Sequence, residues 1–257
     1  MNGEIQQASN IVISARKALF DNKEIDFTPS KYELSIQFLF IPKFLCRKSV
    51  KANSVCEWFD ICLRRGLKDI KFVLPTNREN KHLIGFANTS RCAIVCFWKN
   101  GNISCFCPFW EFDREKEGWK IVYSEQHIKK QPIFKNLHFI NKSDDFKQTL
   151  LDIGKFAIEI EQPYFSDIFH NAYEALCGTE TIEDDNITKQ LPNDFKSIYY
   201  AVDKADVFGA MGSWNDSPPY YAHQKGLDKE YNELSNELLV QLRYHLMYVA
   251  NECWKRD

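Results

Sequence analysis

The sequence predicts an α+β fold: an antiparallel meander sheet of about five to six strands, with N-terminal helices and a helical C-terminal half packed on it. Two observations support this fold. Segments with alternating or continuous apolar residues are gathered before about residue 140, and segments with helical spacing come after it. Strands that are grouped first and helices that follow favour α+β over an alternating α/β fold.

The first two elements differ in their period. From Ile5 to Leu19 apolar residues recur at intervals of three and four, which predicts an amphipathic helix. After residue 30 the period becomes two, which predicts a strand with one buried face. The apolar members of this strand are Tyr32, Leu34, Ile36, Phe38 and Phe40.

A short helix with clear ends is predicted next. Ser54 and Glu57 have the spacing of a capping box, and Gly66 follows two arginines as a left-handed C-terminal cap. Its apolar stripe consists of Val55, Trp58, Phe59 and Cys62.

Five apolar segments then predict the antiparallel sheet, ending near Glu125: "IKFVLP", "HLIGFA", "CAIVCFW", "ISCFCPFWEF" and "WKIVY". Asn100-Gly101 predicts a type I′ hairpin, and "DREKEG" predicts a longer one. Pro108 lacks a backbone N–H, so its strand should be bulged there or lie at an edge.

The second half is predicted to be helical. One helix begins at Ser143 or Asp144, a second runs from Pro163 to a stop at Gly178, and two more span about residues 194–208 and 228–254. We expect one compact unit over residues 1–257, sheet-rich over 1–140 and helical over 141–257. The alternative is that the helical part forms a subdomain.

The composition disfavours some classes of binding partner. The net charge of −2 and the pI near 6.3 provide no general attraction to nucleic acid or to an anionic membrane, and no apolar stretch approaches the roughly 18 residues of a membrane span. A local basic patch at Lys43, Arg47, Lys48 and Lys51 is more typical of a solvated connection than of a phosphate site. Nine cysteines, an odd number spread through apolar segments, favour reduced thiols and a cytoplasmic location.

The sequence lacks the familiar catalytic motifs. It contains no phosphate loop, no dinucleotide fingerprint, no nucleophile elbow, no HExxH and no EF-hand loop, and we expect no cofactor and no metal. Cys105 and Cys107 share one face of a strand and could meet Cys92 and Cys96 in a metal site. The preferred interpretation is that these cysteines are small apolar side chains of a sheet core.

A long connection, "VFGAMGSWNDSPPYYAHQKG", holds the candidate binding residues. Long loops inside compact domains are often functional. The candidates are Asp206, Trp214, Asn215, Asp216, Tyr220, Tyr221 and His223. A structural interpretation also fits: Asp206 would anchor the loop by accepting hydrogen bonds from the N–H groups of residues 212–215, and Trp214 would fill the gap between the helices.

Two functions of different classes follow. The leading hypothesis is a cytosolic binding or interaction protein that presents the loop 206–223 to a protein or small-molecule partner. The alternative is an enzyme of unfamiliar type that acts on a polar small molecule through Asp206, Asp216 and His223. Nucleic-acid binding through residues 43–51 ranks last, and the sequence leaves open whether the chain is an enzyme.

Overall fold

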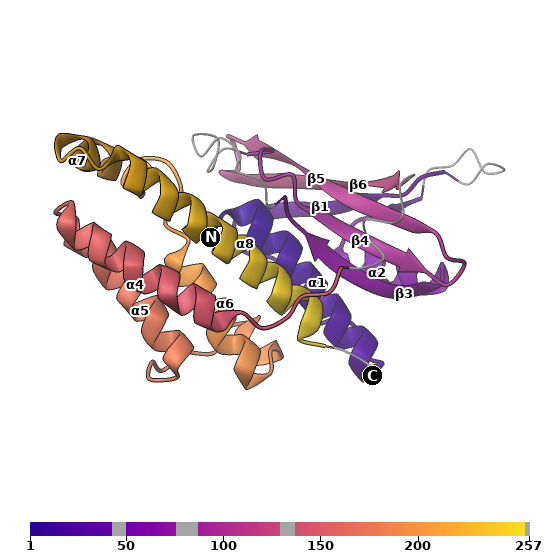
Figure 1. Ribbon diagram of the computed structural model, residues 1–257. Helices are drawn as coiled ribbons and strands as arrows, with labels where there is room; N and C mark the ends of the chain where they lie inside the picture. Colours follow the sequence, from indigo (N-terminus) through magenta and orange to yellow (C-terminus); the bar gives the residue numbers. More distant parts are fainter. Residues whose placement is uncertain (43–49, 76–86, 129–136, 255–257) are drawn as a thin grey trace. The chain divides into compact units, whose positions relative to one another are not determined.

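The fold is known from a computed structural model, which describes residues 1–42, 50–75, 87–128 and 137–254 (Figure 1). The described part contains seven α-helices and one six-stranded sheet, which confirms the α+β class. The helices are α1 (Gly3–Asp21), α2 (Val55–Arg64), α4 (Ser143–Glu159), α5 (Pro163–Cys177), α6 (Asn193–Ala205), α7 (Pro218–Gln224) and α8 (Asp228–Glu252), with a 3₁₀ turn at Thr188–Gln190. The strands are β1 (Glu33–Leu39), β2 (Lys51–Ala52), β3 (Leu67–Val73), β4 (Ala93–Trp98), β5 (Ile103–Asp113) and β6 (Gly118–His127).

The chain divides into two compact units. The sheet unit consists of Glu4–Leu74, Ser90–Phe139 and Ala250–Asp257. The helical unit consists of Met1–Gly3, Pro75–Thr89 and Ile140–Val249. A single compact body over residues 1–257, with the helical half packed on the sheet, stays a prediction.

The sheet is mixed, so the predicted purely antiparallel meander is wrong. The strand order is β2-β1-β6-β5-β4-β3, in which β3 to β6 form an antiparallel meander and β1 pairs with β6 in parallel. The reason lies in α2. It connects β2 to β3, which lie at opposite edges of the sheet and run in the same direction, as a crossover connection requires. The meander then runs back across the sheet from β3 to β6, and β6 lies next to β1 and parallel to it.

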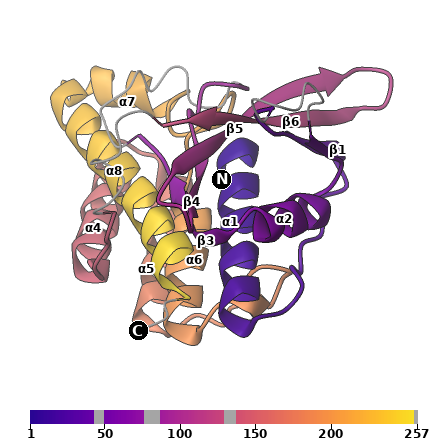
Figure 2. The ribbon, with the colours of Figure 1, turned by 90° about the vertical axis from the view of Figure 1, so that its right-hand side faces the viewer.

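One face of this sheet forms a core with α1 and α2. Phe38 and Tyr123 are partners in the β1–β6 register and are fully buried. The ring of Phe38 stacks on Trp58 of α2 at 4.7 Å, and the Tyr123 hydroxyl donates to Gln7 Oε1 of α1 at 2.8 Å. Both helices therefore cover the same face, and Figure 2 shows them next to each other on it. Tyr32 and Leu34, predicted to be buried, are 57% and 39% exposed because they precede the covered part of β1.

The hairpins lie where the sequence predicts them, but the first turn differs in type. Gly101 has a φ of 81°, whereas Asn100 lies outside the left-handed region, and Gly101 N donates to Trp98 O. This is a type I turn with a glycine bulge rather than a type I′ turn. In the second hairpin, Asp113 Oδ1 accepts hydrogen bonds from the N–H groups of Glu115 and Lys116.

Two places in the sheet have a strand backbone without a neighbouring strand on one side: β5 at Pro108 and the outer side of β3. At Pro108 the strand β5 pairs with β6 alone, because its pairing with β4 ends at Phe106, so the predicted edge position is confirmed. The outer edge of β3 is capped by Asn251, whose amide exchanges two hydrogen bonds with the backbone of Phe72 at 2.7 and 2.8 Å. Capped edges resist pairing with other chains. Most of the predicted strand "HLIGFA" and of the basic patch 43–51 lies outside the described residues.

A buried carboxylate ties the sheet to the end of α2. Glu125 has a fully buried side chain, and its Oε2 lies 2.9 Å from Arg65 Nη1. Ser104 Oγ donates to the other oxygen at 2.9 Å, and the N–H of Ile41 donates to Oε2 at 2.9 Å. The Arg65 guanidinium in turn lies 4.9 Å from the ring centre of Phe40. The charge is therefore both paired and hydrogen-bonded, as burial requires.

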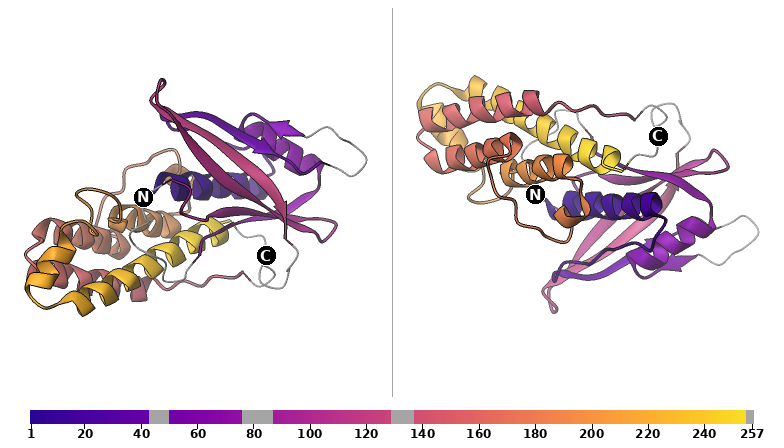
Figure 3. Two further views of the ribbon diagram at one scale, coloured as in Figure 1. Left: turned by 90° about the horizontal axis from the view of Figure 1, so that it is seen from above. Right: turned by 90° about the horizontal axis from the view of Figure 1, so that it is seen from below.

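The helical unit contains the predicted helices with small shifts at their ends. Pro163 opens α5, and Gly178, with a φ of 76°, closes it as predicted. Helices α4 and α5 pack against each other, as do α5 and α6 (Figure 3). Helix α6 ends at Ala205, three residues earlier than predicted. Within the described ranges, no helix combines the length and the apolar character needed to cross a membrane.

We expect Glu125→Ala to lower the free energy of unfolding by about 3 kcal/mol, because it leaves Arg65 and Ser104 without their buried partner. Chemical denaturation of the purified protein measures this change. The control is Glu111→Ala on the exposed side of β5, which should stay within about 0.5 kcal/mol of the wild type. An equal, small effect of both substitutions would show that the buried ion pair does not hold α2.

Candidate functional site

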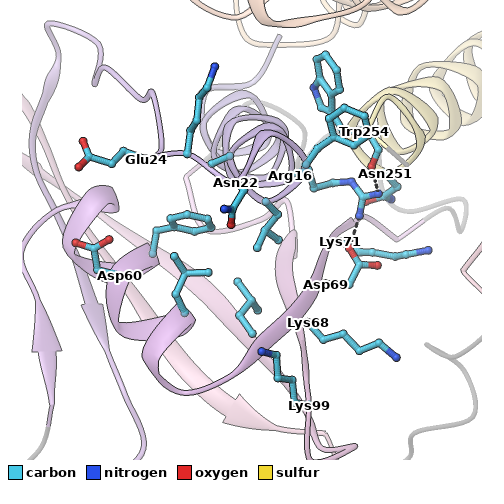
Figure 4. Close-up of a pocket in the computed structure, with 17 residues that line it drawn as sticks. Arg16, Asn22, Glu24, Asp60, Lys68, Asp69, Lys71, Lys99, Asn251 and Trp254 are labelled. Atoms are coloured by element: carbon cyan, nitrogen blue, oxygen red, sulfur yellow. Dashed lines mark hydrogen bonds and ion pairs between the residues drawn. The ribbon is translucent and has the colours of Figure 1, made fainter. Parts of the chain in front are cut away.

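A large groove lies within the sheet unit. Its volume is about 1010 Å³, and it is lined by the end of α1, by α2, by the first half of β3 and by the chain end after α8 (Figure 4). Ligand sites in proteins are mostly concave and apolar, with a few polar groups that fix orientation. The lining residues include Arg16, Phe20, Asn22, Glu24, Phe59, Asp60, Leu63, Leu67, Lys68, Asp69, Lys71, Lys99, Asn251 and Trp254.

Two polar residues that line the groove, Arg16 and Asn251, form hydrogen bonds that stabilise the fold. The buried guanidinium of Arg16 donates to Asp69 Oδ1 at 2.6 Å, to Ile70 O at 2.8 Å and to Trp254 O at 2.7 Å. These bonds hold α1, β3 and the chain after α8 together. Asn251 is committed to the edge of β3 through Phe72. Neither side chain is therefore available as the main ligand contact.

The remaining charges of the groove include two lysines at one end, whereas Lys23 lies next to Glu24 in the chain. Lys68 and Lys99 lie at one end, and Glu24 and Asp60 lie on the opposite side (Figure 4). In the part of the chain that the structure describes, neither Lys68 nor Lys99 makes an ion pair, and both are exposed. Unpaired cations at one end of a groove attract an anionic group of a ligand.

Apolar side chains lie between these charges. Phe20 of α1 and Leu63 of α2 are 43% and 42% exposed, although both line the groove. The ring of Trp254 lies 5.3 Å from that of Phe20, so the two rings form a continuous apolar wall. A ligand with an apolar body would cover these side chains and remove their surface from water.

The loop after α6 combines a buried and an exposed part. Trp214 is fully buried, with its ring 5.1 Å from Phe165 and 5.3 Å from Phe169, and its Nε1 donates to Ser235 Oγ at 2.8 Å. The structural interpretation that Trp214 fills the gap between the helices is confirmed. Its indole is accordingly turned away from solvent, into the core of the helical unit.

Asn215 and Asp216 shape the turn around Trp214. Asn215 Oδ1 accepts hydrogen bonds from Gly209 N at 3.0 Å and from Ser213 Oγ at 2.7 Å. Asp216 Oδ2 accepts one from Gly212 N at 2.8 Å, where Gly212 has a φ of 79°. Asn and Asp side chains commonly stabilise turns in this way. The dense sequence "GSWND" is thus explained by its own hydrogen bonds.

Asp206 differs from the predicted anchor in two ways. It is the C-cap of α6, outside the helix, and its carboxylate accepts hydrogen bonds from the N–H groups of Phe208 and Asn2 rather than from residues 212–215. Burial raises the pKa of the Asp206 carboxyl above its usual value, although the nearby N-terminal ammonium and these two N–H groups lower it in part. The ionised carboxylate is therefore not a net anchor of the fold.

The other candidates of the loop lie on α7, a short helix that the sequence did not predict. Tyr220 and Tyr221 are 61% and 38% exposed, with ring centres 5.6 Å apart. His223 is exposed and pairs with Asp228 at 3.0 Å. No hydrogen bond or ion pair joins Asp206, Asp216 and His223, all of which are described, so no contact supports their joint catalytic role.

The four cysteines considered as a metal site do not share one face. Cys96 is the register partner of Ser104, which lies on the face opposite to Cys105 and Cys107. Cys92 and Cys96 are buried, in agreement with their interpretation as small apolar side chains. Cys105 and Cys107 are half-buried and form a separate pair.

No protein-family model, no curated protein and no solved structure matches this chain, so its site rests on geometry alone.

The sequence did not single out the groove, because its residues come from separate segments. A signal was nevertheless present. Phe20 and Leu63 are large apolar residues that fall outside the apolar stripes predicted for their helices. Such residues mark a ligand-binding surface only where they gather in one patch, which the sequence alone does not show.

We expect Asp206→Asn to be as stable as the wild type at pH 7, within about 1 kcal/mol, or more stable. Because the folded-state pKa is raised, the folded protein binds the proton more tightly than the unfolded chain. The wild type should therefore lose stability relative to Asp206→Asn as the pH rises from 4 to 7. Thermal unfolding of both proteins at the two pH values measures this.

The matched control for this experiment is Glu159→Gln, an exposed acid at the end of α4. Its difference from the wild type should not change with pH beyond the small effect of a helix end. If Asp206→Asn were several kcal/mol less stable at pH 7, with a gap that narrows in acid, Asp206 would be a stabilising anchor after all.

Proposed function

We propose that this protein is a binding protein whose groove takes a small molecule with an apolar body and one anionic group. The observation that carries the proposal is the combination of exposed Phe20 and Leu63 with the unpaired cations Lys68 and Lys99 at one end. The apolar wall would supply most of the binding free energy, and the lysines would set orientation. A carboxylate or a sulfonate on an aromatic or aliphatic body fits this chemistry.

The test uses 8-anilinonaphthalene-1-sulfonate, an anionic probe whose fluorescence rises in apolar surroundings. The full chain should bind it with saturation, and the double variant Lys68→Gln/Lys99→Gln should bind it roughly tenfold more weakly. Binding should also weaken as salt is added, since both lysines are exposed to solvent. Emission from Trp254, which lines the groove, should be quenched as the probe binds.

Two controls make the result specific. The variant Lys116→Gln/Lys229→Gln carries the same change in net charge at exposed positions outside the groove, and it should bind as the wild type does. N-phenyl-1-naphthylamine has the same rings without the sulfonate, so its affinity should not respond to the loss of Lys68 and Lys99. Equal affinity of both lysine double variants for the anionic probe would refute the proposal that the groove binds it.

A second binding surface is supported by α7. Tyr220 is 61% exposed, and Met211, which precedes it in the loop 206–223, is 95% exposed. Exposed tyrosines on a short helix suit a protein partner, because aromatic residues dominate interface energetics. We propose that this part of the loop 206–223 contacts a protein.

A photo-crosslinking amino acid at position 220 tests this surface in the cells that produce the protein. We expect a cross-linked protein from position 220 and none from position 158, a matched exposed site on α4. The added substitution Tyr221→Ala should reduce the cross-link. Identical products from positions 220 and 158 would mean that α7 has no special partner.

A cytoplasmic location for these activities is part of the proposal. It is supported by the described cysteines, all of which are free thiols and half of which are buried in apolar surroundings. The net charge of −2 supports a partner other than nucleic acid.

A further inference from the structure

Two thiols lie next to each other on the sheet face opposite to α1 and α2. Cys105 and Cys107 are two residues apart on β5, so their side chains leave the same face of the strand. Their sulfur atoms are 3.9 Å apart, and both residues are half-buried. The next residue on this face, Phe109, is 58% exposed, so the pair is accessible from solvent.

The extended backbone of β5 keeps the two sulfurs close to each other but farther apart than a disulfide bond. Cys105 is paired with Gln126 and Cys107 with Ser124 in the β6 register, which fixes β5 in an extended conformation. Residues two apart on a strand have Cα atoms about 6.6 Å from each other, near the upper limit for a disulfide. A bond of about 2.05 Å would require the sulfurs to approach and the strand to bend. The pair is therefore built to remain a dithiol.

We propose that Cys105 and Cys107 form a two-thiolate site for one Cu(I) ion. Two metal–sulfur bonds of about 2.3 Å span at most about 4.6 Å, so both sulfurs at 3.9 Å reach one ion without movement of the backbone. Thiolates are the soft ligands that Cu(I) prefers, and two of them complete its coordination.

The surroundings select against zinc. Among the residues that the structure describes, no group of three or more His, Cys, Asp or Glu side chains is suited to hold a metal. Zinc in structural sites is bound by four protein ligands, and this pair supplies two. Cu(I), a soft monovalent ion, can be bound by two thiolates alone, and this pair supplies two.

Binding requires the thiolate form of both residues, because thiolates rather than thiols are the metal ligands. The two sulfurs lie 3.9 Å apart, so both can bind the same ion. Binding forms two Cu–S bonds and releases the protons of both thiols to solvent, with no change in oxidation state.

The experiment titrates the reduced full chain with Cu(I) under anaerobic conditions, in competition with bathocuproine disulfonate. We expect the protein to withdraw one Cu(I) ion per chain from the chelator. Cys105→Ser and Cys107→Ser should each weaken binding by roughly 100-fold or more, because the second thiolate binds the ion intramolecularly. Circular dichroism and thermal unfolding should show that both variants fold as the wild type does.

The matched control is Cys56→Ser/Cys177→Ser, which removes two cysteines that are exposed among the described residues and stand apart from the pair, and it should leave Cu(I) affinity unchanged. The proposal is overturned if the wild type does not compete for Cu(I), or if Cys105→Ser binds Cu(I) as well as the wild type. It is also overturned if the pair closes to a disulfide in air, detected as a mass lower by two hydrogens, because the strand would then not keep the thiols apart.

Discussion

The carboxylate of Glu125 is the constraint on which the sheet unit depends. A charge with no exposed surface must be paired, and Glu125 finds its partners on three separate segments, at Arg65, Ser104 and Ile41. Arg65 is the C-cap of α2, so the carboxylate fixes where this helix ends. The guanidinium also lies over Phe40 and Trp98, which links the ion pair to the aromatic core of the same face. The C-terminal end of α2 is thus held against the sheet by one buried ion pair, while Trp58 packs its middle on Phe38.

The groove is a consequence of this placement. Because α2 carries the chain from β2 to β3, it crosses the face that α1 also occupies, and the two helices leave a groove between them. Its floor includes β3, an edge strand whose backbone is capped by Asn251 and Arg16 rather than by another strand. Those two side chains close the edge. Within the described residues, Lys68 and Lys99 of the groove make no ion pair, whereas Lys71 donates to Leu137 O. The proposed binding surface thus lies where the sheet ends at β3.

Local features were predictable from the sequence, and long-range pairings were not. The capping box at Ser54 and Glu57, the glycine stop at Gly178 and the edge position of Pro108 depend on residues close in sequence, and each is confirmed. The parallel pairing of β1 with β6 was missed, because strand periodicity does not encode the direction of a neighbour. Asp206 was misjudged for a related reason: its N–H partners include Asn2, which no spacing connects to it. The groove and the ion pair of Glu125 likewise join residues far apart in the chain.

The buried and exposed parts of the loop after α6 support each other. Trp214 is fixed from several sides: Ser235 accepts from its indole, and the Tyr231 hydroxyl donates to its carbonyl at 2.8 Å. Asn215 and Asp216 close the turn that precedes α7, so the helix that carries Tyr220 starts from a rigid base. When a surface with a fixed backbone binds a partner, it loses mainly side-chain conformational entropy, whereas a mobile loop also loses backbone conformational entropy. The anchoring of this loop therefore supports the proposal that its exposed tyrosines contact a partner.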